Sequence, residues 1–365
     1  MILACYFSKK RDAMSDLFKN LIEAMPSKEE IAVVIPSAYK DDTFSNNIGY
    51  KVVEDITSIK SKGKRLLYLI PFFFRLRKKL KKYNIDKIYL QNDIFTFNFL
   101  IWLMFRKSAT FTLWLHDPIL HEGVPKKEKI HRFFSMLTYF HEVKNFILSY
   151  HSIYDNISKI EGLSCYKNRM KVISLPQMPE MEFADIADMK NNLGIIEYDY
   201  IFFGRIEEYK GLELFIDAFR ETVGKKKLLI VGTGNDEEII KKKVNLDHRI
   251  KFINRYVDNR DLAKYIVKSK CVILPYKSAT GSQTVAIANY YGRIVLATKV
   301  GCFPEYIREG ENGFFIEDYT VEAMKDALKK VDYYIDCCTP EKIENIYNQF
   351  DINRIANQLY HEIIS

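Results

Sequence analysis

Two cationic side chains, Arg205 and Lys210, stand at the junction of an expected strand and an expected helix. The run 200–203 is apolar and aromatic, which is typical of a buried strand, and Gly204 ends it. Apolar residues recur at helical spacing over 212–219, so a helix is expected there. A helix start offers free N–H groups and a positive dipole end, so this junction favours a phosphate or diphosphate. The alternative is a strand–turn–helix unit with two solvated cations.

A resemblance to a known family rests on two stretches in fixed order. GRIEEYKGLELFIDAF (residues 204–219) resembles the start of the donor-binding half of the family 4 glycosyltransferases, and VILPYKSATGSQTVAIANYYGRIVLATKVGCFPEYIREGENGFFI (residues 272–316) resembles that family's later signature. The resemblance implies an α/β chain of the GT-B type, with two Rossmann-like, doubly wound parallel-sheet domains facing a cleft. It also implies that Arg205 and Lys210 grip the diphosphate of a nucleotide sugar.

The chain length predicts two domains, because 365 residues are too many for one ordinary core. Between Leu175 and Tyr198 two prolines break the periodicity and the sequence turns polar, so we place the boundary there. We expect an acceptor-side domain over 1–177 and a nucleotide-sugar-binding domain over 178–340. We expect a single helix over 341–364, and the resemblance implies that this C-terminal segment, 341–365, packs back on the N-terminal domain.

The charge and cysteine content narrow the class of protein. A formal charge of +8 fits anionic substrates or an anionic membrane surface and is too weak to indicate nucleic acid. The six cysteines are scattered without Cys-x-x-Cys spacing, which indicates free thiols in a reducing compartment. Met1–Cys5 reads as a first strand and not a secretion signal, and the apolar run Ile94–Phe105 is too short to span a bilayer. We expect a cytoplasmic protein, peripheral at the inner face of the cell membrane if its acceptor is lipid-linked.

The N-terminal half alternates short β-rich runs with helical patterns, which predicts a parallel sheet. No Gly-rich phosphate loop follows the first strand, so this half is a poor candidate for the nucleotide site. The expected strands are Ile2–Phe7, Ile31–Ile35, Lys87–Leu90, Thr110–Leu115, Phe146–Ser149 and Lys171–Ser174.

His116 and Asp117 directly follow the expected strand 110–115. Ligands in open α/β sheets bind outside the carboxyl ends of strands, so both side chains are expected to point into the cleft. Many members of the resembled family have a His at the equivalent strand end that contacts the transferred sugar. The resemblance therefore implies a catalytic-site role for His116, with Asp117 binding substrate beside it. Alternatively, His116 merely caps the strand loop.

The stretch 62–83 is rich in aromatic residues, leucine and cations. Such a helix can lie in a membrane interface, with its apolar rings at the acyl boundary and its cations on lipid phosphates. In that case the acceptor is carried on a lipid. The alternative is a core helix with a solvated basic face.

Further positions in the C-terminal half lie at expected strand ends and helix starts. Gly232 follows the strand 228–231, and a glycine there lets the backbone approach a ligand closely. The resemblance implies substrate binding at Gly204, Gly232, Tyr256, Val257, Gly281, Ser282, Gln283 and Thr284. Asp258 is also a candidate helix N-cap, and that structural role alone suffices for it. Since two cations and two helix dipoles would stabilise a leaving diphosphate, no metal cofactor is expected.

The chain departs from the resembled family at its pair of glutamates separated by seven residues. Anchored on Gly292, the two positions hold Ala279 and Ile287, and no Asp or Glu occurs between Leu262 and Pro304. Either backbone groups and residues 282–284 replace those contacts, or only binding remains. Glu305 keeps the family's position near the donor, and a surface carboxylate that caps the next helix is its alternative. The missing pair leaves retention or inversion of stereochemistry open.

The resemblance implies an enzyme that transfers a sugar from a nucleotide diphosphate-sugar to a saccharide acceptor, in the synthesis of a surface polysaccharide or a lipid-linked glycan such as lipopolysaccharide. His116, Arg205 and Lys210 are its expected catalytic residues. One alternative is a non-catalytic nucleotide-sugar-binding subunit of a polysaccharide assembly complex. Another is a nucleotide-sugar epimerase on the same fold, which would need carboxylates that the region 279–287 lacks.

Overall fold

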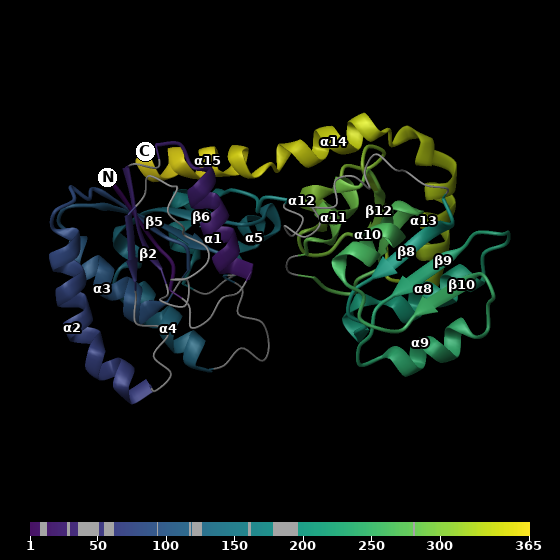
Figure 1. The fold of residues 1–365 in the computed structure, drawn as a ribbon, viewed down its shortest axis with the longest axis horizontal. Coiled ribbons are helices and arrows are strands. Elements are labelled where there is room, and N and C mark those ends of the chain that lie inside the picture. The colour runs from purple at the N-terminus through teal and green to yellow at the C-terminus, as the bar shows by residue number, and fades with distance from the viewer. Residues whose placement is uncertain are drawn as a thin grey trace. The chain divides into compact units, whose positions relative to one another are not determined.

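The chain divides into two compact units, one formed by Met1–Leu175 with Ile352–Ser365 and the other by Pro176–Asp351. The structure is a computed structural model, and it describes residues 1–7, 13–27, 30–35, 51–54, 62–92, 94–116, 118, 126–159, 162–177, 196–279 and 282–365. In each unit, helices cover a parallel sheet (Figure 1).

The first unit is built on seven parallel strands in the order β3-β2-β1-β4-β5-β6-β7. They are β1 Ile2–Cys5, β2 Ile31–Ile35, β3 Lys51–Glu54, β4 Lys87–Leu90, β5 Thr110–Leu115, β6 Val143–Leu148 and β7 Met170–Val172. Six lie within a few residues of the predicted strands, and β3 is an addition that the sequence analysis did not predict.

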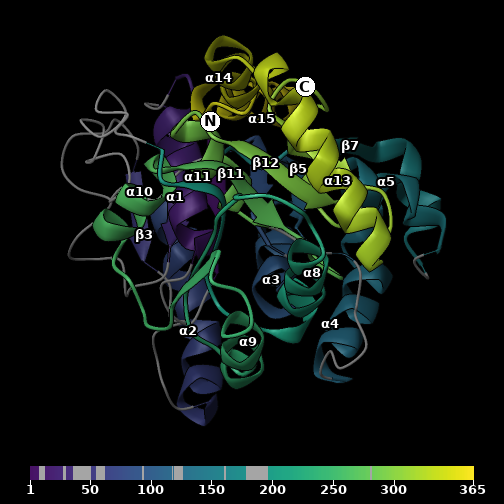
Figure 2. The same ribbon diagram turned by 90° about the vertical axis from the view of Figure 1, so that its right-hand side faces the viewer.

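Helices lie on both faces of this first sheet. They are α1 Ala13–Ala24, α2 Lys62–Leu80, α3 Phe95–Phe105, α4 Lys126–Leu137, α5 His151–Asp155 and α15 Ile352–Ile364, with short 3-10 helices at Phe140–Glu142, Ile157–Lys159 and Ser164–Arg169. Helices α2, α3 and α4 cover one face, and α1 with α15 covers the other (Figures 1 and 2). This division follows from right-handed crossovers that run in opposite directions on the two sides of β1.

The second unit contains six parallel strands in the order β10-β9-β8-β11-β12-β13. They are β8 Tyr198–Phe203, β9 Leu228–Val231, β10 Ile250–Ile253, β11 Ser269–Leu274, β12 Ile294–Thr298 and β13 Gly313–Ile316. The helices are α8 Leu212–Arg220, α9 Glu237–Val244, α10 Asn259–Val267, α11 Thr284–Tyr290, α12 Phe303–Tyr306, α13 Val321–Tyr334 and α14 Pro340–Gln349, with 3-10 turns η6 Glu208–Lys210 and η7 Ile335–Cys337. The inner strands are almost continuously apolar, as expected for a sheet covered on both faces.

Both sheets reverse their strand order at one point, which confirms the predicted doubly wound architecture. The reversal lies between β1 and β4 in the first sheet and between β8 and β11 in the second. Open α/β sheets bind ligands outside the carboxyl ends of the strands at such a switch point. In the second sheet, that point places Gly204 beside the residues that follow Leu274.

The C-terminal segment differs from the single helix expected over 341–364. It forms α14 and α15, and the break falls at residues 350–351. The Phe350 ring packs edge-on against Tyr306 at 4.8 Å, and the Phe350 carbonyl accepts a hydrogen bond of 2.9 Å from the Gln177 N–H, so α14 stays with the second unit. Helix α15 belongs to the first unit, where it packs on α1 and where the Asn145 amide donates to the Glu362 carbonyl at 2.7 Å.

Among the helices of the described residues, none has the length and apolar character needed to cross a membrane.

Candidate anion-binding site

The carboxyl ends of β8 and β9 approach each other as closely as glycine permits. Gly232 has a φ of 147°, and a Cβ atom there would lie 1.9 Å from the Gly204 carbonyl oxygen. The Gly204 N–H donates to the Val231 carbonyl at 3.0 Å, which continues the ladder beyond the strands. Any side chain at Gly232 would therefore push the two strand ends apart, and bare backbone faces the edge of the sheet.

The short turn η6 places the ammonium group of Lys210 over the end of β8. Lys210 is 9% exposed, and its Nζ lies 5.8 Å from the centre of the Phe202 ring and 5.2 Å from that of Tyr276. A Cβ on Gly204 would lie 3.1 Å from the same Nζ. Among the described residues, no carboxylate forms an ion pair with Lys210, although unpaired cations are rarely buried.

Burial, followed by the positive charge of Arg205, lowers the pKa of Lys210 to about 8, and the charge of Glu207 opposes this shift. The structure thus places the two cations predicted from the sequence close enough for their charges to repel each other. Arg205 is exposed, and in the described part of the chain its guanidinium makes no ion pair either. An anion at this edge would relieve the repulsion and favour the protonated form of Lys210.

Tyr276 connects Lys210 to the start of α11. Burial raises the pKa of the Tyr276 hydroxyl, and hydrogen bonds with Thr284 and Ser282 act in the opposite direction. The Ser282 hydroxyl also bonds to Thr284 Oγ1 at 2.9 Å and accepts from the Thr284 N–H at 3.2 Å. Sequence reasoning missed Tyr276. Its position two residues beyond the end of β11 was the available signal, because it places the side chain at the same sheet edge as Gly204.

The start of α8 is held against the loop after β11 by Gly211. This residue has a φ of 65°, and a Cβ there would lie 2.0 Å from the Pro275 carbonyl oxygen. The Lys277 N–H donates to the Tyr209 carbonyl at 2.7 Å across the same junction. The loops after β8 and β11 are therefore joined directly, which fixes Lys210 relative to Tyr276.

Glu305 lies near this edge as well, in the short helix α12, and is 9% exposed. Burial raises the pKa of the neighbouring Cys302 thiol to about 12; a hydrogen bond to the backbone of Ser282 opposes this rise, and the charge of Glu305 adds to it. The two loops that carry Ser282 and Glu305 are thus neighbours. Ile287, at a position where the resembled family has Glu, is buried in α11 and offers no polar atom.

The other predicted positions of the second unit differ in their burial and in their local roles. Val257 is buried while Tyr256 is 80% exposed. Asp258 caps α10 by accepting from the Asp261 N–H at 2.9 Å, which confirms its structural role. Gln283 occupies the N-cap position of α11 without a side-chain cap. Gly281 lies outside the described residues, as does Asp117 in the first unit.

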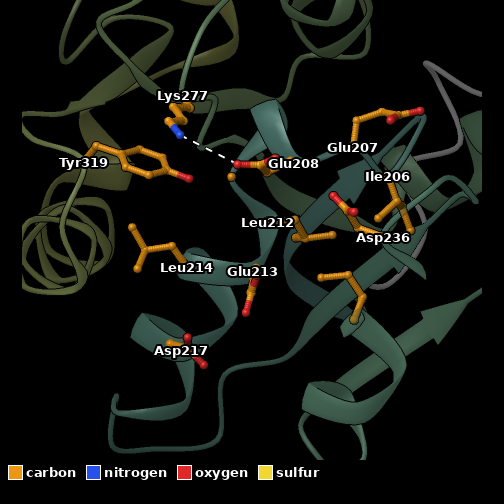
Figure 3. A pocket seen from close by; sticks show the side chains of 12 residues that line it. Ile206, Glu207, Glu208, Leu212, Glu213, Leu214, Asp217, Asp236, Lys277 and Tyr319 are labelled. Atoms are coloured by element: carbon orange, nitrogen blue, oxygen red, sulfur yellow. Dashed lines mark ion pairs between the residues drawn. The ribbon is translucent and has the colours of Figure 1, made fainter. Parts of the chain in front are cut away.

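A pocket of about 250 Å³ opens beside the start of α8 (Figure 3). Lys277 faces Glu208 across its rim in an ion pair of 3.7 Å, with Tyr319 close by. Its lining contains the carboxylates Glu207, Glu208, Glu213, Asp217 and Asp236. These negative charges make the pocket unsuited to a diphosphate, in contrast to the edge that carries Lys210.

His116 belongs to the first unit, at the carboxyl end of β5. Its Nδ1 lies 3.0 Å from Ser149 Oγ, which also accepts a hydrogen bond of 2.9 Å from Trp114 Nε1. Because an indole N–H can only donate, the Ser149 hydroxyl hydrogen is available to His116 Nδ1. Ser149 therefore holds the His116 ring at the carboxyl end of β5.

In its described part, helix α2 buries most of the apolar side chains that were expected to enter a membrane. From Pro71 onward, where its side chains are described, Phe72, Phe73, Leu76 and Leu80 are buried, and Phe74 is 70% exposed. The cations Arg75, Arg77, Lys78 and Lys79 are exposed. This part of α2 matches the alternative, a core helix with a solvated basic face.

Residues 197–331 match the family model described as "Glycosyl transferases group 1". The chain carries a glycosyl transferase group 1 domain. This domain holds Arg205, Lys210, Tyr276 and Glu305, and it lies wholly within the second unit. The family model does not extend to the first unit, and hence it does not cover His116.

A GDP-mannose:glycolipid 4-beta-D-mannosyltransferase of Xanthomonas campestris pv. campestris is 33% identical over 99 residues. That alignment covers 26% of this chain and 28% of the relative, so the likeness spans little more than a quarter of either protein.

Solved structures resemble the whole chain. Anabaena HepE, crystallised with UDP and glucose, has a TM-score of 0.65 at 17% identity and covers 100% of this chain and 99% of its own. The lipopolysaccharide outer core galactosyltransferase WaaB has a TM-score of 0.68 at 13% identity, with 100% and 98% coverage. These likenesses establish the fold, so the group 1 domain and the first unit together have the predicted GT-B fold.

Proposed function

We propose that this protein is a glycosyltransferase that moves a hexosyl group from a nucleotide diphosphate-sugar to a saccharide acceptor. One observation carries the proposal: a buried lysine, which forms no ion pair with any carboxylate of the described residues, stands at the switch point of the group 1 domain, next to Arg205. The group 1 family model over 197–331 supports the same reaction class. HepE, which has the same fold, binds UDP and UDP-glucose.

In the proposed mechanism, the diphosphate leaves the sugar as negative charge develops on its oxygens. Lys210 and Arg205 stabilise that charge, and it grows most at the moment of bond cleavage. The open backbone at Gly204 and Gly232 and the hydroxyls of Ser282 and Thr284 complete the contacts, with Tyr276 holding the hydroxyls in place. Since the cations supply the positive charge, the proposal requires no metal.

Other contacts in the proposal follow the resembled family. The backbone at Tyr256 and Val257 lies beside the base, Gln283 adds to the phosphate contacts, and Glu305 takes the donor sugar in place of the missing glutamates. His116 contacts the transferred sugar.

We propose that the acceptor is a lipid-linked saccharide of a surface polysaccharide or lipopolysaccharide. The mannosyltransferase relative acts on a glycolipid, and WaaB is a lipopolysaccharide galactosyltransferase. The protein would then work at the inner face of the cell membrane as a peripheral protein. The donor base is not specified by these relatives, since one uses a GDP-sugar and HepE binds UDP.

A thermal-shift panel of UDP, GDP and dTDP tests the donor site. A ligand that binds only the folded state raises the melting temperature, so one diphosphate is expected to stabilise the wild type and to lose that effect in Lys210→Ala. Lys225→Ala is the matched control, because Lys225 is an exposed lysine of the same unit.

Lys210→Ala and Arg205→Ala should each lower the rate of sugar transfer by about a hundredfold or more. Normal turnover in both variants would refute the site.

A non-catalytic binding subunit is the second candidate, and Ala279 and Ile287 favour it because they remove the family's two glutamates. It predicts diphosphate binding without transfer or donor hydrolysis. Release of the nucleoside diphosphate from a donor sugar by the purified chain would exclude it.

A further inference from the structure

Helix α4 turns its apolar stripe outward. Ile130, Phe133, Phe134 and Leu137 are 52%, 53%, 44% and 59% exposed, and their spacing places them on one face of the helix. Ser135, on the other side, is fully buried. A helix packed on a sheet normally buries its apolar stripe and exposes its polar residues. The reversed orientation of α4 therefore indicates that its apolar stripe contacts something other than the core of its own unit.

The apolar stripe of α4 continues onto α3. The Phe95 ring lies 5.6 Å from that of Phe134 and 5.4 Å from that of Phe99, and Leu103 is 52% exposed. The two helices lie side by side in both views (Figures 1 and 2). We call Phe95, Phe99, Leu103, Ile130, Phe133, Phe134 and Leu137 the α3–α4 surface.

Positive charge is concentrated in the part of the sequence that contains α2 and α3. Residues 62–107 contain twelve Lys and Arg against two Asp and no Glu, a net +10 in a chain whose formal total is +8. Arg106 and Lys107 are exposed at the end of α3, and the Arg106 guanidinium lies 5.0 Å from the centre of the Trp102 ring. Helix α2, which carries exposed cations from Arg75 to Lys79, lies on the other side of α3 from α4 in both views (Figures 1 and 2).

We propose that the α3–α4 surface docks this protein on an anionic lipid bilayer. Its apolar side chains enter the boundary between headgroups and acyl chains, and the flanking cations meet lipid phosphates. A second copy of the chain is a poorer occupant, because it would bring a like charge against the same flank. The proposal deepens the proposed function and rests on it for the lipid-linked acceptor. It assigns insertion to α3 and α4, and leaves α2 an electrostatic part alone.

Flotation of the full-length protein with vesicles tests this assignment in the absence of donor and acceptor. Wild-type protein is expected to float with vesicles of phosphatidylcholine and phosphatidylglycerol, and less with pure phosphatidylcholine or at high salt. The variant Ile130→Ser/Phe133→Ser/Leu137→Ser should bind the anionic vesicles about tenfold or more weakly. The matched control is Val223→Ser/Leu246→Ser, at residues 98% and 66% exposed in the second unit, and it should bind like the wild type.

A second variant reports insertion directly. Phe133→Trp places an indole in the α3–α4 surface, and its fluorescence should be quenched by brominated anionic lipids, while Val223→Trp should not be. Equal flotation of the triple variant and the wild type would overturn the proposal, as would an unquenched Phe133→Trp. A dimer in solution that the triple variant abolishes would assign the surface to a second copy.

The diphosphate thermal shift separates this test from that of the proposed function. The triple variant should show the same shift as the wild type, because its substitutions lie in the other unit. Vesicle binding without any diphosphate shift would sustain the docking surface and refute the donor site.

Discussion

The charge of Lys210 is expected to make diphosphate binding depend on pH. Its pKa is lowered to about 8 from an ordinary value of 10.5, so the free protein loses this positive charge as the pH rises through about 8. A bound diphosphate favours the protonated form. Affinity should therefore be highest below pH 8 and fall above it, by up to about tenfold per pH unit.

Isothermal titration calorimetry on both sides of that pKa measures this fall and the accompanying uptake of a proton by the complex. Lys210→Arg is the control, because a guanidinium keeps its charge throughout this range. Its affinity should stay level where that of the wild type declines. Level affinity in the wild type itself would remove Lys210 from the binding site.

The sequence was enough to select Arg205 and Lys210, because a strand end followed by a helix start is visible as a change of period. It was not enough to predict that Lys210 is buried. That property depends on the ring of Tyr276, which comes from a different strand and reaches Lys210 only through the parallel pairing of β8 with β11. The position of the His116 ring likewise depends on Ser149, a residue of the neighbouring strand loop.

At the level of elements, the anchoring of α14 by Phe350 can be tested. Phe350→Ala removes a ring that is 7% exposed and packs on Tyr306, so it should lower the free energy of unfolding of the second unit by about 2 to 4 kcal/mol. Urea denaturation measures the loss. Glu344→Ala, at an exposed position of the same helix, should change stability little.

The strands were predictable because each is a compact apolar run between breaks, and β8 and β9 lie where the pattern indicated. Helix faces were harder to predict. The spacing of apolar residues cannot show that the stripe of α4 points away from the sheet, since its direction is decided by what the opposite face of the helix can pack against. The break between α14 and α15 was missed for a related reason: it depends on long-range contacts of Phe350.

For the whole molecule, the two-unit division predicts separable unfolding. Removal of residues 352–365 takes Leu359 and Ile363 out of the core of the first unit and leaves the second unit complete. Differential scanning calorimetry of the truncated chain should show one transition lowered and the other unchanged. The unchanged transition should be the one that the bound diphosphate raises. An equal lowering of both transition temperatures would contradict this division.

The position of α15 at the end of the chain also affects the order in which the two units complete their folding during synthesis. The ribosome synthesises the strands of the first sheet early, then the whole second unit, and only afterwards the helix that packs on α1. Domains generally fold as they emerge, so the second unit can be finished while the first still waits with exposed apolar surface. During biosynthesis the first unit, and not the group 1 domain, should therefore be the part most dependent on chaperones.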